Sequence, residues 1–116
     1  MPEFMLLLHD RPGVYRAASP RQMQEIIERY RAWSHDLSAK GRLVGGHKLT
    51  DDDGKVLGPG TNGVLVKDGP YSETKEVVGG YFLIEAADYA DAVEISRGCP
   101  HLEFGGYIEL RQIDKR

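Results

Sequence analysis

One stripe of apolar side chains at helical spacing constrains the fold of this 116-residue chain more than any other feature. The stripe consists of Met23, Ile26, Ile27, Tyr30, Trp33 and Leu37. Intervals of three and four residues place these side chains on one face of an α-helix, which must be buried against another layer. Ser19 suits the N-cap, Pro20 the first helical position and Gly41 the residue after the helix. The sequence therefore predicts a long amphipathic helix from Pro20 to just before Gly41.

The remaining regular segments are predicted strands and one shorter helix. Apolar runs bounded by turn residues predict strands at residues 4–8, 43–49, 80–85 and 107–113. Two shorter runs predict a hairpin at residues 55–57 and 63–67. Asp88 suits the N-cap of a helix over residues 89–97, which Gly98 and Pro100 end. We therefore predict a single domain over residues 1–116, of the α+β class, with the ferredoxin-like βαββαβ order and an inserted β-hairpin.

Both faces of the predicted sheet carry apolar side chains. Every residue from Phe4 to Leu8 is apolar, and the run from Tyr81 to Ile84 repeats the pattern. In the ferredoxin-like plan both helices cover one face of the sheet, and the sequence offers no third helix for the other face. We predict that a second copy of the chain covers it, which gives a homodimer packed sheet to sheet.

Composition excludes several classes of function. The net charge is −3 and no basic block occurs, so the electrostatic footprint of a nucleic-acid-binding protein is absent. The longest apolar run, Phe4–Leu8, is too short to span a bilayer and has no basic leader before it. The single cysteine, Cys99, excludes an internal disulfide and fits a reducing compartment. We therefore expect a cytoplasmic protein that binds neither nucleic acid nor membranes.

Three motif matches fail on their context. The G-x-G-x-x-G match at residues 58–63 is followed by a strand, whereas a dinucleotide fingerprint needs a helix there. The S-x-x-K match at residues 72–75 lacks the further elements of serine acyl-enzymes. The acidic run at residues 51–53 lacks the distal glutamate of a calcium loop. No histidine has a partner at metal-ligand spacing, so we predict no metal site and no cofactor.

The segment Asp68-Gly69-Pro70-Tyr71-Ser72-Glu73-Thr74-Lys75-Glu76 combines a strong turn signal with dense charge. A structural interpretation is a capped helical turn that begins at Ser72. A functional interpretation is that carboxylates and an ammonium group lie at the rim of the sheet, where a pocket would shift their pKa values. The candidate catalytic residues are Asp68, Glu73 and Lys75. Candidate helpers are His9 and His47, which lie near strand ends and suit proton transfer at neutral pH.

Further polar residues are candidates for ligand binding. In and beside the same segment these are Tyr71, Glu76 and Tyr81. Glu109 and Arg111 share one face of the last predicted strand. The guanidinium group there either binds a carboxylate ligand or holds Glu109 in place.

Several motifs together resemble the DGPF-type branch of the YCII-related family. They are Phe4–Leu8, Asp68–Glu76, Gly79–Ile84, Cys99-Pro100 and Glu109–Arg111, so the resemblance spans most of the chain. The resemblance implies a ferredoxin-like fold in the dimeric α/β-barrel group. It gives no settled biochemical role, although some members are encoded beside extracytoplasmic-function sigma factors.

A related branch of this family contains enzymes that use a His-Asp pair, for example to eliminate chloride from a chlorinated aromatic ring. The positions that correspond to this pair fall near Tyr30 and Ala39, so neither residue type is kept. Two hypotheses stay open. One is a small-molecule enzyme in which Glu73 or Asp68 is the base and Lys75 stabilises a developing anion. The alternative is a ligand-sensing or partner-binding module without turnover, linked to sigma-factor regulation.

Overall fold

The computed structural model describes residues 1–11, 13–69 and 76–116. The elements in these ranges are, in chain order, β1 (Glu3–Asp10), α1 (Pro20–Ala39), β2 (Leu43–Lys48), β3 (Lys55–Gly60), β4 (Gly63–Asp68), β5 (Val77–Glu85), α2 (Tyr89–Arg97), the short 3-10 helix η1 (Pro100–Phe104) and β6 (Tyr107–Gln112). Each predicted helix and strand is therefore present, with differences of a few residues at the ends of some elements. No helix in the described ranges has the length and apolarity needed to cross a membrane.

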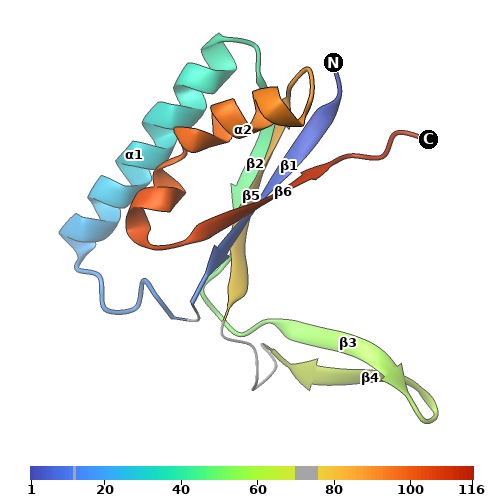
Figure 1. The fold of residues 1–116 in the computed structure, drawn as a ribbon. Coiled ribbons are helices and arrows are strands. Elements are labelled where there is room, and N and C mark those ends of the chain that lie inside the picture. The colour runs from blue at the N-terminus through green and yellow to red at the C-terminus, as the bar shows by residue number, and fades with distance from the viewer. Residues whose placement is uncertain (12, 70–75) are drawn as a thin grey trace.

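The strands β2, β5, β1 and β6 form one antiparallel sheet in that order, and β3 pairs with β4 in a separate hairpin. Both helices lie on the same side of the four-stranded sheet, and the hairpin projects away from it (Figure 1). This arrangement is the ferredoxin-like fold with an inserted hairpin, so the predicted α+β class is confirmed. The opposite face of the sheet has no helix over it in Figure 1.

The ends of α1 follow from the residues that cap it. The Ser19 hydroxyl accepts a hydrogen bond from the backbone N–H of Gln22 at 3.1 Å, and the Gln22 side chain accepts one from the backbone N–H of Ser19 at 2.7 Å. This capping box satisfies two backbone donors that a helix start leaves unpaired. At the other end Gly41 has a φ of +71°, a conformation that glycine adopts without strain.

The core lies between the sheet and the helices. Phe4 and Leu6 are fully buried and Leu8 is nearly so, because alternate residues of β1 point toward the helices. Ile84 of β5 and Leu37 of α1 complete the centre of the cluster. The next residue of the same alternation is Asp10, a carboxylate that is only 7% exposed. β1 therefore delivers one ionisable side chain to the inner face of the sheet, at the end of a row of core residues.

Candidate active site

A cavity of about 500 Å³ lies between the inner face of the sheet and α1. Much of its wall is apolar and comes from Leu8, Met23, Ile26, Ile27 and Phe82. Its polar groups include Asp10, Tyr15, Tyr30, Ser34, Lys48 and His101. The volume is within the usual range for small-molecule sites, and an apolar wall with a few polar groups is typical of them.

Asp10 is the central ionisable group of this cavity. The Tyr15 hydroxyl donates a hydrogen bond to its Oδ1 at 3.5 Å, and His101 Nε2 lies 3.6 Å from the same oxygen. A Cβ atom on Gly79 would lie 2.4 Å from Asp10 Oδ2, so glycine at this position makes room for the carboxylate. Burial raises the pKa of Asp10, and the nearby His101 and Lys48 oppose that rise.

His101 is held in one orientation by three neighbours. Its side chain is 1% exposed, and its Nε2 lies 2.9 Å from the backbone carbonyl oxygen of His9. Because a carbonyl oxygen only accepts, Nε2 carries the hydrogen, and in neutral His101 Nδ1 then accepts from the Tyr30 hydroxyl at 2.8 Å. Burial raises the pKa of Tyr30, which keeps its hydroxyl protonated. The hydrogen on Nε2 is therefore donated to the His9 carbonyl oxygen, and Asp10 Oδ1 lies 3.6 Å from the same nitrogen.

Together these groups support acid–base chemistry. A carboxylate whose pKa is raised by burial is a better proton acceptor near neutral pH than an ordinary aspartate. The Tyr15 hydroxyl donates to Asp10, and His101 Nε2 lies 3.6 Å from the same carboxylate oxygen, so the charged form of Asp10 has polar neighbours. Among the residues that the structure describes, no group of three His, Cys, Asp or Glu side chains is placed to hold a metal ion.

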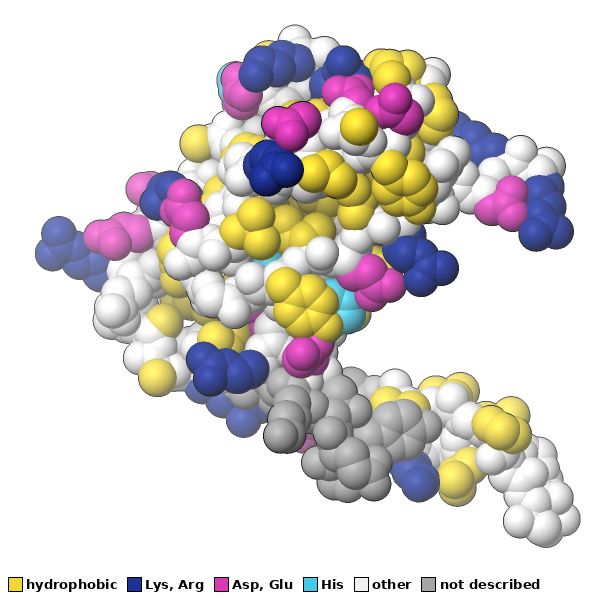
Figure 2. All heavy atoms as spheres, in the orientation of Figure 1, with side chains coloured by type: hydrophobic (Ala, Val, Ile, Leu, Met, Phe, Trp, Pro, Cys, Tyr) yellow, Lys and Arg dark blue, Asp and Glu magenta, His cyan; other side chains and the backbone are white. Residues whose placement is uncertain are grey.

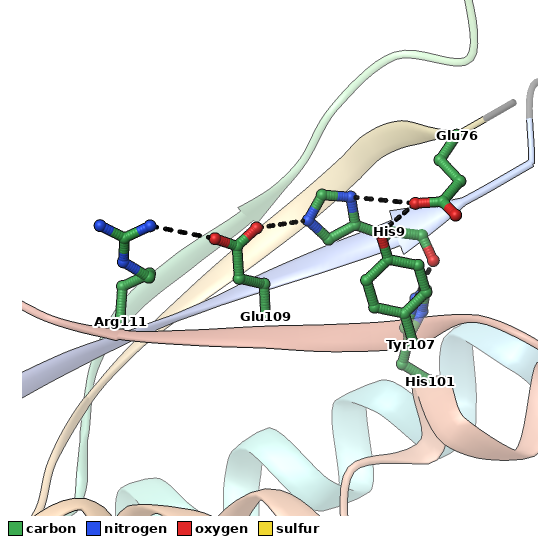
Figure 3. A network of polar contacts seen from close by, with 6 residues as sticks. All are labelled: His9, Glu76, His101, Tyr107, Glu109 and Arg111. Atoms are coloured by element: carbon green, nitrogen blue, oxygen red, sulfur yellow. Dashed lines mark hydrogen bonds and ion pairs between the residues drawn. The ribbon is translucent and has the colours of Figure 1, made fainter. Parts of the chain in front are cut away.

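A second polar cluster lies on the opposite face of the sheet (Figure 3). His9 Nε2 donates to Glu109 at 3.0 Å, and Arg111 donates to the other oxygen of Glu109 at 3.2 Å. Tyr107 stacks on the His9 ring with centroids 4.6 Å apart and donates a hydrogen bond to Glu76, whose Oε2 lies 4.0 Å from His9 Nδ1. The hydrogen bonds from His9 and Arg111 lower the pKa of Glu109, and the hydrogen bond to Glu76 raises that of Tyr107.

His9 joins the two clusters through its own backbone. Its ring belongs to the second cluster, on the sheet face away from the helices, which we call the open face. Its carbonyl oxygen accepts a hydrogen bond from His101 on the inner face, which the helices cover. In the strand register His9 pairs with Tyr107 of β6 and precedes Asp10 directly. The position of His101 beside Asp10 therefore depends on the end of β1.

Several of the residues predicted from sequence lie together. The structure brings His9, Glu76, Glu109 and Arg111 into the second cluster (Figure 3). It also brings His47 and Tyr81 together, with a hydrogen bond of 2.8 Å between Nδ1 and the hydroxyl. Both border the cavity, but in the strand register Tyr81 pairs with Leu7, which places their side chains on the open face.

The predicted catalytic residues are not brought together with the cavity in the part of the chain that the structure describes. Asp68 lies on β4 with its side chain 77% exposed and forms an ion pair with Lys55 of β3. Tyr71, Glu73 and Lys75 lie outside the described residues. The catalytic role of Asp68, Glu73 and Lys75 therefore stays a prediction.

The family of the chain follows from a comparison with family models. The model of the YCII-related domain matches residues 2–115, which is nearly the whole chain. The chain belongs to the YCII-related family. A search of curated proteins finds no significant match. The fold and both polar clusters described above are thus those of one member of this family.

Sequence reasoning missed four of the polar side chains at the cavity of this YCII-related chain, namely Asp10, Tyr15, Tyr30 and His101. The residues around Asp10 favour a turn that ends the first strand, and Tyr30 fits an apolar stripe. A signal for Asp10 is nevertheless present, because Phe4, Leu6, Leu8 and Asp10 share one parity of the strand. His101 and Tyr15 carry no comparable signal, since each reaches the cavity from irregular or 3-10 structure.

Replacing Gly106 with alanine should disturb His101 and lower the free energy of unfolding by about 1–3 kcal/mol, the usual cost of overpacking. A Cβ atom there would lie 2.2 Å from His101 Nε2 and 2.7 Å from the His9 carbonyl oxygen. Urea denaturation followed by circular dichroism measures the loss. Gly45→Ala is the matched control, because its Cβ would meet no atom within 4 Å. Equal effects of the two substitutions would contradict the prediction.

Proposed function

We propose that this YCII-related protein is an enzyme that transfers a proton on a small molecule bound in the cavity, with Asp10 as the general base. The observation that carries the proposal is a carboxylate that is 7% exposed on the wall of a largely apolar cavity. Such burial is costly for a charged group, so an ionisable side chain at this position is unusual for a core. Perturbed carboxylates in clefts are typical of acid–base sites.

The proposed step is a proton transfer without any change of oxidation state. Ionised Asp10 takes a proton from the substrate and becomes a neutral acid, and the electron pair left behind stays on the substrate. Returning the proton to another atom completes an isomerisation. In an elimination that electron pair instead forms a new double bond, and the leaving group departs with the electrons of its own bond. The Tyr15 hydroxyl stabilises Asp10 through its hydrogen bond whenever the carboxylate is charged, and Lys48 does so through space.

The proposal places the base on Asp10 rather than on Asp68 because only Asp10 borders the cavity. Lys48, which also borders it, supplies the positive charge that the sequence-based hypothesis assigned to Lys75. Glu73 and Lys75 stay candidates for a contribution from the segment that follows β4.

The test is isotope exchange, which detects proton transfer on any substrate, whatever the overall reaction. The purified protein is incubated in D2O with mixtures of small metabolites, and mass spectrometry and NMR detect deuterium incorporation or chemical conversion. We expect enzyme-dependent exchange or conversion of at least one compound. A compound that raises the melting temperature but is recovered unlabelled and unchanged would instead favour a ligand-sensing module, the alternative that relatives encoded beside sigma factors suggest.

We also propose that the protein is a homodimer in which two sheets pack through their open faces. Met5 and Leu7 on this face are only half-buried and pair with Leu83 and Tyr81 of β5. The hairpin exposes further large apolar side chains, visible in Figure 2 along the arm that leaves the body; they are Leu57, Val64, Leu65 and Val66. A two-stranded hairpin with such a surface is poorly stable alone, which supports a partner that covers it.

Light scattering should give twice the chain mass of 12.9 kDa at micromolar concentration. We expect Leu7→Arg to produce monomers, because it places an unpaired charge at the centre of the proposed interface. Val93→Arg on α2, where the side chain is already 40% exposed, is the control and should leave the dimer intact. A monomeric wild-type protein at this concentration would contradict the proposal.

A further inference from the structure

From the charges around the cavity, we infer that its ligand is a small carboxylate with an apolar body, whose anionic group binds Arg31 and Lys48. This inference rests on the proposed function, because it names the substrate class of the same site. It starts from an imbalance of charge. Of the charged side chains that border the cavity, Arg31 and Lys48 are cations and Asp10 is the single acid within the described ranges.

Arg31 stands out among the cations of α1. Within the part of the chain that the structure describes, it forms no hydrogen bond or ion pair through its side chain. Three other cations of the same helix region each have a carboxylate within 4 Å, namely Arg21 with Glu25, Arg29 with Glu103, and Lys40 with Asp36. The guanidinium group at the cavity border therefore keeps all five of its donors available for a ligand.

Lys48 is the second available cation. Its ammonium donates to the carbonyl oxygen of Leu49 at 3.0 Å and lies 5.4 Å from the centre of the Tyr15 ring. It has no carboxylate within 4 Å among the described residues, although it acts on Asp10 through space and lowers its pKa. An ammonium with one hydrogen-bond partner has two donors left.

The apolar wall of the cavity indicates the chemistry of the rest of the ligand. Met23, Ile26 and Ile27 of α1 face Phe82 and Leu8 of the sheet across the cavity, so the body of the ligand is apolar. With Asp10 ionised, the bordering groups sum to one positive charge, which one carboxylate neutralises. A carboxylate also suits the chemistry, because anchoring an acid group fixes which carbon of the ligand meets Asp10.

The experiment measures binding by calorimetry with three probes of the same shape. Phenylacetate is the anionic probe, 2-phenylacetamide the neutral one and phenethylamine the cationic one. We expect phenylacetate to bind about tenfold or more tightly than the amide, as a charge-assisted hydrogen bond provides, and phenethylamine to bind weakest. An affinity for phenylacetate no greater than that for the amide, or no binding of either, would overturn the inference.

Variants assign the selectivity to particular residues. Arg31→Gln and Lys48→Gln should each weaken phenylacetate binding about tenfold and leave binding of the amide unchanged. Arg21→Gln, on the same helix but away from the cavity, is the matched control and should change neither affinity. If both Arg31→Gln and Lys48→Gln keep wild-type affinity for phenylacetate, the inference is wrong. Unchanged melting temperatures of the variants without ligand confirm that they fold.

One further variant separates this inference from the proposed function. Asp10→Asn removes a negative charge from the cavity, so it should tighten phenylacetate binding while isotope exchange is lost. Tight, selective binding of carboxylates with no exchange by the wild-type protein would leave the ligand class standing and reject the enzyme. Isotope exchange on neutral compounds alone would support the enzyme and reject the carboxylate as its ligand class.

Discussion

Replacing Phe4 with alanine is expected to lower the free energy of unfolding by about 3–5 kcal/mol. The Phe4 ring is fully buried in β1 and meets the ring of Tyr89 edge to face, with centroids 4.9 Å apart and planes at 74°. Truncation removes this contact and leaves a cavity that the surrounding sheet and helix fill only in part. Because small domains are stable by about 5–15 kcal/mol, such a loss brings the variant close to unfolding.

Urea denaturation at 25 °C, followed by far-ultraviolet circular dichroism, measures this change directly. Leu102→Ala is the comparison, since the Leu102 side chain is 46% exposed and should cost about 1 kcal/mol or less. If Phe4→Ala and Leu102→Ala destabilise the protein equally, the row Phe4, Leu6 and Leu8 is not the centre of the core. Unchanged slopes of the denaturation curves are expected, because neither change alters how much surface unfolding exposes.

The row of buried residues that begins at Phe4 is one of the local patterns that made the fold predictable from sequence. Period-two burial along β1 and period-three-to-four burial along α1 are local signals, and each spans enough residues to be unambiguous. The caps at Ser19 and Gly41 mark the ends of α1 by short-range hydrogen bonds, which neighbouring residues determine. The strand order then follows from the element order, because a split βαβ chain has few ways to pair its strands.

The site was harder to predict because its members come from distant parts of the chain. Tyr30 and His101 are 71 residues apart, and His9 and Glu109 are 100 residues apart. No local pattern indicates such pairs; they meet only once β1, β6 and η1 are folded against α1. Glu109 and Arg111 were predicted to share a strand face, with the guanidinium group either binding a ligand or holding Glu109, and the structure shows a contact of 3.2 Å between them.

Asp10 carries two conflicting sequence signals, the turn preference of aspartate and the alternating burial of β1. Aspartate after an apolar run is most often a turn residue, which favours ending the strand at Leu8. The structure continues β1 through Asp10, because His9 and Asp10 pair with Val78 and Val77 across a shift in register. A carboxylate at the buried parity of a strand is therefore a signal that the sequence contained, and the turn preference of aspartate concealed it.

The largest effect on function is expected from Asp10→Asn. In the isotope-exchange assay we expect this substitution to lower the rate of exchange about 10²–10⁴-fold, the usual contribution of a general base. An amide keeps the size and the accepting oxygen of the side chain, so the hydrogen bond from Tyr15 is retained while proton acceptance is lost. Asp36→Asn on the outer face of α1, where Asp36 pairs with exposed Lys40, is the matched control and should leave the rate unchanged.

The pH dependence of the free energy of unfolding is a second test of Asp10. Burial raises the pKa of Asp10 in the folded protein above its ordinary value of 3.8, so the unfolded chain releases this proton at lower pH than the folded one. The stability contribution of protonated Asp10 is therefore complete below pH 3.8 and is lost as the pH rises through the folded pKa. Asp10→Asn lacks this loss, so its free energy of unfolding relative to wild type should increase as the pH rises from 3.8 through the folded pKa of Asp10. A variant that is destabilised at every pH but keeps its exchange rate would make Asp10 a structural residue and return the search for the base to Glu73.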